Sequence, residues 1–318
     1  MAAASSASPR RGRTLGLAAA GDIPGPAAAQ RHAAPPPRPA AVNRRRCDCF
    51  DLHQQLVPFE ESLAWQQSIV ERRNGLAGRG EDHSDTLIAL QHPPVFSLGN
   101  GATNDNECLH FNREDPPFEV HEVKRAGKAT YHGPGQLVMY PILNLCYHGR
   151  YLDWYLRSLE EVIIRALQNT FSINASRVKD LTGVFVGNQK VASIGIHVVF
   201  PRLITCQGIA LDVTTDLSPF EMIVPCGIKD CRMGSIKEIL QKASDGRGID
   251  DTSLMDITYN SMIKEFAEAF ASPAKQPQMS VQQIGPLLDI GLTENSARQL
   301  TFFRSRSGSF CLCVDTWP

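Results

Sequence analysis

The chain has 318 residues, of which 42% are hydrophobic and 20% are charged, and its formal net charge at pH 7 is −1. This length allows a sizeable core, and because no run of about 18 apolar residues occurs, we expect neither a membrane-spanning helix nor a membrane partner. Residues 1–46 carry eight arginines and one acid, which leaves 24 basic and 32 acidic residues in the rest of the chain. An acidic body argues against nucleic-acid binding, since contacts to phosphates supply most of that affinity.

Residues 1–46 form a head that is rich in Ala, Pro, Ser and Arg. It lacks the long apolar core of a secretory signal, and its basic, acid-poor composition is typical of a plastid or mitochondrial transit peptide. A disordered basic tail without a targeting role is the alternative. We therefore predict a disordered transit peptide over 1–46, a folded domain over 47–270 and an irregular tail over 271–318.

The first periodic segment is LVPFEESLAWQQSIVERR, in which Pro58 suits a first helical turn. Residues of one face recur at helical spacing, namely Phe59, Leu63, Gln66 and Val70, so a helix is predicted here. Residues 86–90 then predict a strand. This strand ends at the Pro93-Pro94 pair and is followed by a second short apolar run.

Residues 125–136 read RAGKATYHGPGQ and stand directly before an apolar run. Gly127, Gly133 and Gly135 have no Cβ, so the backbone can take positive φ and a ligand can approach main-chain N–H groups closely. Pro134 stiffens the segment. Ordinary turns account for many such loops, and this one lacks the spacing of a P-loop or a dinucleotide site. The pattern predicts a rigid loop that walls a substrate pocket.

The apolar run at residues 137–145 predicts a buried strand, in which Pro141 indicates a bulge or an edge position. From Leu152 onward, apolar residues follow a 3.6-residue period and predict a helix. The positions concerned are 152, 155, 156, 159, 162, 163, 166 and 167.

The segment GVFVGNQKVASIGIHVVF predicts two strands that turn at Gly187-Asn188, so that Lys190 stands at the start of the second. A further strand, GIALDV, and a loop, TTDLSPFEMIVPCGI, lead to Cys226. A last helix is predicted over about 253–270. Its inward residues are expected to be Leu254, Ile257, Ile263, Phe266 and Phe270. Because helices and strands mix without strict alternation, the sequence predicts an α+β fold, a mixed sheet with packed helices.

Cys226 lies between Pro225 and Gly227, where a tight turn can expose one side of the thiol. The thiolate is the reactive form, so such a cysteine needs a nearby cation to lower its pKa. Lys190 is a candidate, because small residues follow it and leave room. A packed, inert cysteine and a solvated lysine stay open as alternatives, since spacing does not show contact, and His132 is open between a scaffold and a catalytic role. No C-x-x-C pair occurs among the nine cysteines, so no metal site is predicted.

Four segments carry a resemblance to a known family: RAGKATYHGPGQLVMYPILNL, NQKVASIG, GIALDVTTDLSPF and PCG. In this order and at these intervals they resemble the lipoyl(octanoyl) transferase family over roughly residues 50–270, and above all its plant plastid type. The resemblance implies the α+β fold of biotin and lipoate protein ligases. Residues 47–270 would then form an octanoyltransferase catalytic domain.

The resemblance also implies a reaction, in which an octanoyl group moves from octanoyl-acyl carrier protein to a specific lysine of lipoyl domains. The transfer would run through a cysteine thioester, as the first step of endogenous protein lipoylation. The implied acceptors are the lipoyl domains of 2-oxoacid dehydrogenase E2 subunits and the glycine cleavage H protein. Exchange between a thiolate and a thioester is close to energy-neutral, so neither ATP, another cofactor nor a metal is expected, and two successive displacements give ping-pong kinetics.

Residue roles follow from the matched motifs. Cys226 matches the family's nucleophile, and Lys190 matches the lysine that lowers its pKa; Lys190 would also act as general base for the acceptor lysine. Three stretches match substrate-binding segments, and their members are Arg125, Ala126, Gly127, Lys128, Ala129, Thr130, Tyr131, His132, Ser193, Ile194, Gly195, Gly208, Ile209 and Ala210. Backbone N–H groups near Gly208 or at Gly227 are expected to stabilise the oxyanion.

Three positions depart from the family pattern: Ala126 replaces a glycine, Gln207 a histidine and Asp212 an asparagine. A methyl group at 126 would narrow the pocket or forbid positive φ, and Gln207 cannot shuttle a proton. Two alternative functions stay open. One is an ATP-dependent lipoate-protein ligase, which needs no nucleophilic cysteine, and the other is a non-catalytic protein that binds acyl carriers or lipoyl domains.

The plastid type of the resemblance agrees with the composition of the head. The chloroplast stroma is therefore the predicted location, and the mitochondrial matrix is the alternative. Acyl carrier protein and lipoyl domains are usually acidic, while the body of this chain is itself acidic. A local basic patch is expected, and its four candidates are Lys124, Arg125, Lys128 and Arg202.

Overall fold

The computed structural model describes residues 46–102, 108–148, 152–228, 231–243, 248, 250–270, 300–304 and 310–314. The predicted transit peptide lies outside the described residues, except for Arg46, which begins the first strand. Within the described ranges, no helix combines the length and the apolar character that crossing a membrane requires.

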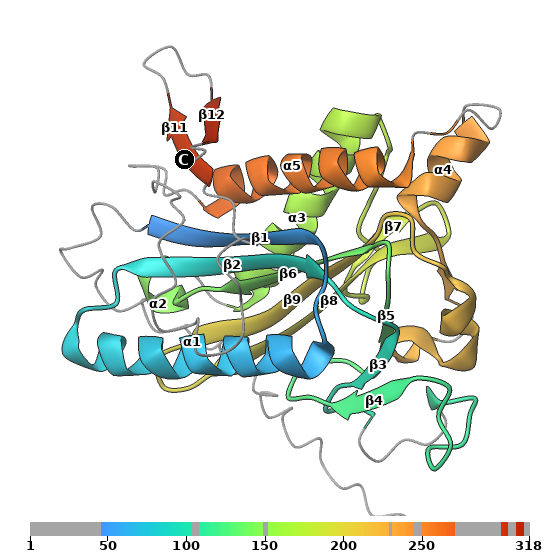
Figure 1. Ribbon diagram of the computed structural model, residues 1–318, viewed down its shortest axis with the longest axis horizontal. Coiled ribbons are helices and arrows are strands. Elements are labelled where there is room, and N and C mark those ends of the chain that lie inside the picture. Colours follow the sequence, from blue (N-terminus) through green and yellow to red (C-terminus); the bar gives the residue numbers. More distant parts are fainter. Residues whose placement is uncertain are drawn as a thin grey trace, which may run out of the picture. The chain divides into compact units, whose positions relative to one another are not determined.

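A mixed sheet of seven strands forms the centre of the described domain, in the order β1-β2-β6-β9-β8-β10 with β7 beside β8 (Figure 1). β1 pairs with β2, and β8 with β10, in parallel, whereas the other neighbours are antiparallel. The strands are β1 (Arg46–Leu56), β2 (Ser84–Gln91), β6 (Gln136–Ile142), β7 (Val184–Val186), β8 (Gln189–Val199), β9 (Ile204–Asp212) and β10 (Arg232–Met233). The observed sheet confirms the predicted α+β class.

Helices cover both faces of this sheet (Figure 1). α1 (Phe59–Arg79) packs on one face, where Trp65 and Ile69 contact an apolar cluster that includes Val138 of β6. α3 (Leu152–Phe171) and α5 (Asp251–Phe270) pack against each other and on the other face, over the larger core. α1 begins after Pro58 and ends at Gly80, which takes the left-handed conformation typical of a helix C-terminus. Two shorter helices, α2 (Leu145–His148) and α4 (Ile236–Ala243), complete the set among the described residues.

A second, smaller sheet has the strand order β4-β3-β5. Its strands are β3 (Val95–Leu98), β4 (Glu119–Glu122) and β5 (Ala129–His132). Phe96, Tyr131 and Phe220 belong to the apolar cluster that supports it. The loop predicted over 125–136 is therefore wrong for Ala129–His132, which is a fully buried strand. Four residues between glycines are too few to show a strand pattern, and only pairing with β3 fixes this strand.

Pro141 does not lie on an edge strand, because β6 pairs with β2 on one side and with β9 on the other. The ladder between β6 and β9 ends at Met139, so the missing N–H of Pro141 interrupts no bond on that side. The Pro141 carbonyl accepts a hydrogen bond from the Thr205 hydroxyl at 2.9 Å instead. The predicted edge position is thus wrong, and so is the alternative of a bulge, because neither ladder of β6 shows a register shift. The strand ends at Ile142 rather than at 145.

Other predictions hold or fail for local reasons. The helices predicted from Phe59, from Leu152 and over 253–270 are α1, α3 and α5. Ile257 is 39% exposed rather than inward, since the buried side of α5 is formed by residues such as Tyr259 and Met262. β1 and α4 were not predicted, because charged residues alternate with cysteines at the start of β1 and α4 has only 8 residues. The tail predicted to be irregular contains two paired strands, β11 (Leu300–Arg304) and β12 (Phe310–Val314), and its other residues lie outside the described ranges.

His53 joins β1 to α5. Its Nδ1 lies against a carboxylate oxygen of Asp51, its Nε2 lies 2.7 Å from Asp256 Oδ1, and its ring stacks on Tyr259 with centroids 4.0 Å apart. Both ring nitrogens face carboxylates, so the geometry favours the imidazolium form. Burial acts to lower the pKa of His53, but the two carboxylates outweigh it, and the pKa lies above its ordinary value of 6.5.

We expect His53→Gln to destabilise the fold in acid more than in base. A raised folded-state pKa contributes stability that is complete below the unfolded pKa and is lost as the pH rises through the folded pKa. The loss should be roughly 1–3 kcal/mol below pH 6.5 and should shrink above it. Calorimetric unfolding of both proteins across pH measures the difference. The exposed His83→Gln is the control, and a difference that does not change with pH contradicts the prediction.

Candidate active site

Cys226 lies in a short 3-10 turn, η4 (Pro225–Gly227), that follows an extended residue. Its φ of 55° falls in the left-handed region, which costs a non-glycine residue about 1–3 kcal/mol. Two hydrogen bonds close the turn, because Gly227 N–H donates to Val224 O at 2.9 Å and Ile228 N–H donates to Pro225 O at 3.0 Å. The turn leaves Cys226 partly exposed. It also engages the Gly227 N–H, which was expected to stabilise an oxyanion.

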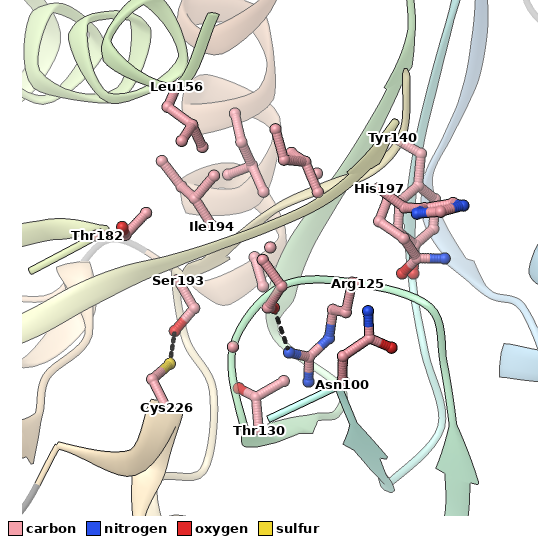
Figure 2. Close-up of a pocket in the computed structure, with 18 of the residues that line it drawn as sticks. Asn100, Arg125, Thr130, Tyr140, Leu156, Thr182, Ser193, Ile194, His197 and Cys226 are labelled. Carbon is pink, nitrogen blue, oxygen red and sulfur yellow. Dashed lines mark hydrogen bonds between the residues drawn. The ribbon is translucent and has the colours of Figure 1, made fainter. Parts of the chain in front are cut away.

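Lys190 lies behind the sulfur as the second residue of β8. It is fully buried, and its Nζ donates to Cys226 Sγ at 3.1 Å. The Ser193 hydroxyl lies 3.6 Å from the same sulfur (Figure 2). Because a buried ammonium needs an opposite charge, this contact favours an ammonium–thiolate pair. The structure thus brings Lys190 and Cys226 into contact. The spacing of the two residues in the sequence could not show this contact.

The pKa of the Cys226 thiol lies below its ordinary value of 9.0. Burial acts to raise this pKa, but the charge and hydrogen bond of Lys190, the Ser193 hydroxyl and the charge of Arg125 together outweigh it. Other cysteines show what burial does alone, since it raises the pKa of Cys206 to about 11. The environment therefore selects Cys226 as a nucleophile.

A cavity of about 490 Å³ opens beside Cys226. The register of β8 and β9 sets Ser193 opposite Ala210 and Gly195 opposite Gly208, so these four residues share one face of the sheet. All four line the cavity.

Residues 125–127 pack directly on this face of the sheet, because Ala126 N–H donates to Ile196 O at 3.0 Å and a Cβ at Gly195 would lie 2.9 Å from Arg125 Cδ. Glycine at 195 thus allows the close approach of this segment. The cavity lining is mostly apolar, which suits an aliphatic chain.

The cavity also has residues on the other side of β8. Figure 2 shows Leu156 and Ile194 across the strand from Ser193 and Cys226. Leu156 comes from α3, and both apolar residues line the cavity.

Most of the predicted substrate-binding residues line this cavity, namely Arg125, Ala126, Gly127, Thr130, His132, Ser193, Ile194, Gly195, Gly208, Ile209 and Ala210. Lys128, Ala129 and Tyr131 do not line it. Ala129 and Tyr131 belong to the core of the small sheet, because side chains alternate along β5 and only Thr130 and His132 face the cavity. Alternation could have separated these residues had the strand been recognised.

Arg125 is a buried residue, only 6% exposed, and its guanidinium donates to Ser97 O at 2.8 Å and to Ser97 Oγ at 2.9 Å. It therefore cannot belong to the basic surface patch predicted from the sequence. Of the four candidates, Lys124 and Arg202 are exposed and Lys128 is half-buried. The charge of Arg125 acts on Cys226 instead.

His132 acts as scaffold in this arrangement. Its Nδ1 lies 2.7 Å from Gln136 Oε1, and its Nε2 lies 3.3 Å from Ser97 Oγ. Since Gln136 Oε1 only accepts, Nδ1 carries the proton and Nε2 accepts from Ser97. Burial, followed by the nearby His92 and Arg125, lowers the pKa of His132 to about 3, so the ring is neutral at pH 7.

The three departures from the family pattern are accommodated. Ala126 does not take positive φ; Gly127 does, with φ 90°. Gln207 takes φ 61°, and its N–H donates to Gln66 Oε1 at 2.8 Å. Asp212 is buried and accepts from Gln136 Nε2 at 2.9 Å, and burial raises its pKa to about 7.

Two residues that support Lys190 were missed in the sequence. Gly183, with φ 126°, packs so closely that a Cβ there would lie 2.6 Å from Lys190 Cε. Its N–H donates to Glu160 Oε1 at 3.2 Å, and Glu160 is in turn held by Arg157 at 2.7 Å and by Arg177 at 2.9 Å. No spacing signal links α3 to this loop, so only the fold reveals the contact.

Comparison with known proteins identifies a matching family model and similar octanoyltransferases. Residues 58–271 match the family model of the lipoyl protein ligase A/B catalytic domain. A chloroplastic octanoyltransferase of Arabidopsis thaliana is 47% identical over 243 residues, which cover 76% of this chain and 84% of that protein. An octanoyltransferase of Nostoc punctiforme is 44% identical over 190 residues, 60% of this chain and 79% of that protein.

Solved structures agree in fold. A lipoate-protein ligase A bound with ATP gives a TM-score of 0.53 at 15% identity, over 79% of this chain and 97% of that chain. A T. acidophilum protein with bound lipoic acid gives 0.52 at 15% identity, over 80% of this chain and 99% of that chain. At such low identity these likenesses show the fold alone.

Proposed function

Because this chain belongs to the lipoyl protein ligase A/B catalytic domain family and to its octanoyltransferases, we propose that it transfers an octanoyl group to a lysine of a lipoyl domain through a thioester on Cys226. The observation that carries this proposal is the 3.1 Å contact between Lys190 Nζ and Cys226 Sγ at the edge of the cavity. Adenylate chemistry needs no such nucleophile, so the pair favours a transferase over an ATP-dependent ligase. It also disfavours a protein that only binds.

The first half-reaction is attack of the Cys226 thiolate on the thioester of octanoyl-acyl carrier protein. A new C–S bond forms, and the carrier thiolate leaves. That thiolate takes a proton from the Lys190 ammonium and departs as a neutral thiol. Lys190 is then an uncharged amine beside the acyl-enzyme, 3.1 Å from the sulfur in the free protein.

In the second half-reaction the amine of the acceptor lysine attacks the same carbonyl carbon. Lys190 accepts the proton that this nitrogen releases, the amide bond forms, and Cys226 leaves as thiolate. The ammonium–thiolate pair is thereby restored. The octanoyl chain would lie in the cavity beside Cys226, which Ser193 and Ala210 line together with the apolar residues Leu156 and Ile194.

The partners and the location follow from the same proposal. We propose octanoyl-acyl carrier protein as donor and lipoyl domains of 2-oxoacid dehydrogenase E2 subunits and the H protein as acceptors. Lys124 and Arg202 are exposed and would contact acidic partners. Raised salt should therefore weaken the binding of octanoyl-acyl carrier protein. The chloroplastic name of the Arabidopsis relative supports a plastid location, with the stroma as the compartment and residues 1–46 as the transit peptide.

Acyl-enzyme trapping tests this function. We expect a proteolytic peptide that contains Cys226 to gain the mass of one octanoyl group after incubation with octanoyl-acyl carrier protein without nucleotide. Cys226→Ala should remain unmodified. Burial raises the pKa of Cys231, so this thiol is not expected to react, and the control Cys231→Ala should still be acylated on Cys226. Folded wild-type protein that stays unmodified, or that needs ATP, contradicts the proposal.

A further inference from the structure

The cavity contains a hydroxyl group that the free protein does not use. Thr130 is 5% exposed and lines the cavity, and its Oγ1 has no hydrogen-bond partner among the described residues. A buried hydroxyl without a partner destabilises a fold. A partner supplied by the substrate would explain why such a group stands here.

The backbone holds Thr130 rigidly. It is the second residue of β5, where it pairs with Ser97 of β3. Its neighbours Ala129 and Tyr131 are anchored in the core of the small sheet. β5 packs against η4, the turn that carries Cys226. Figure 2 shows the Thr130 hydroxyl on the side that faces Cys226.

Other donors near the sulfur already have at least one hydrogen-bond partner. Gly227 N–H donates to Val224 O. The Arg125 guanidinium donates to Ser97 and to the Ala126 carbonyl. Ser193 is within hydrogen-bond distance of the sulfur. Among these groups, the Thr130 hydroxyl is the one with no hydrogen-bond partner in the described residues.

We propose that Thr130 is a further catalytic residue, whose hydroxyl donates a hydrogen bond to the carbonyl oxygen of the octanoyl thioester. This role rests on the proposed function. When the thiolate attacks, the carbonyl double bond opens, its electron pair moves to oxygen, and the hydroxyl stabilises that oxyanion. When the intermediate collapses, the electron pair returns to carbon and a thiolate leaves. The same oxyanion forms in both half-reactions, so Thr130 serves both.

Thr130→Val and Thr130→Ser form a matched pair for the test. Val keeps the shape and removes the hydroxyl, whereas Ser keeps the hydroxyl. We expect Thr130→Val to slow both acylation by octanoyl-acyl carrier protein and transfer to the acceptor by about 10²-fold. Thr130→Ser should stay within a few-fold of wild type. The thermal midpoint of Thr130→Val should be unchanged or higher, because an unpartnered hydroxyl has been removed from the interior.

Alkylation of Cys226 by iodoacetamide separates this role from thiolate formation. Displacement at a saturated carbon puts no charge on an oxygen, so the alkylation rate and its pH profile should match wild type in Thr130→Val. A Thr130→Val protein that transfers octanoyl at the wild-type rate overturns the proposal, and so does one whose alkylation falls in parallel with transfer. A wild type that forms no acyl-enzyme overturns this role together with the proposed function.

Discussion

Lys190→Met should move the ionisation of Cys226 to higher pH and reduce octanoyl transfer by roughly 10³-fold or more at neutral pH. Lys190 makes the largest contribution to lowering the pKa of this thiol, while burial acts in the opposite direction. Without the ammonium, burial is opposed only by Ser193 and Arg125, so the thiol is mostly protonated at neutral pH. The same change removes the base that accepts the proton of the incoming lysine.

The pH profile of iodoacetamide alkylation measures this shift directly, and octanoyl transfer to a lipoyl domain measures the loss of activity. Met has a similar length and no charge, so it can fill the space of a side chain that is fully buried. The Cys226 thiolate can take up a proton when the ammonium is removed, so no unpaired charge stays buried and the fold should be retained. The exposed Lys179→Met is the matched control and should change neither measurement. Alkylation profiles that coincide for wild type and Lys190→Met would refute the role of the ion pair.

The predictable parts of the fold are those that depend on the sequence pattern of a few neighbouring residues. The 3.6-residue period from Leu152 gave α3, and the Gly187-Asn188 turn placed Lys190 at the start of β8. Both signals lie within a few residues of the element that they define. The contact between Lys190 and Cys226 joins β8 to η4, so no local pattern carries it, and the expectation rested on resemblance.

The parts that were not predictable depend on partners far along the chain. β5 exists because it pairs with β3, and Arg125 is buried because it donates to Ser97 and packs against Gly99 and Gly195. An arginine beside Lys124 looks like a surface residue in sequence. Only packing shows that one of these two cations is inside and the other outside.

Gly183→Ala is expected to disable the site although it replaces neither Cys226 nor Lys190. Gly183 has φ 126°, which an alanine adopts only with strain. Its Cβ would lie 2.6 Å from both Lys190 Cε and Ala192 O, and 3.2 Å from Lys190 Nζ. The loop cannot simply retreat, because Gly183 N–H is held by Glu160, which is itself bound by Arg157 and Arg177. Lys190 must therefore move away from the sulfur, or the Glu160 bond must break.

We expect Gly183→Ala to lower the free energy of unfolding by about 1–3 kcal/mol, to shift alkylation of Cys226 to higher pH and to reduce transfer by at least about 10²-fold. Gly187→Ala is the matched control, since Gly187 lies on the same hairpin with φ 58° and no atom within 4 Å of its Cβ position. It carries the cost of positive φ without the steric contact, so it should lose some stability and keep the wild-type alkylation profile. If both variants lose stability and neither shifts the ionisation of Cys226, Gly183 does not hold Lys190 in place. If only Gly183→Ala shifts the ionisation of Cys226, the close packing of Gly183 against Lys190 contributes to the reactivity of the thiol.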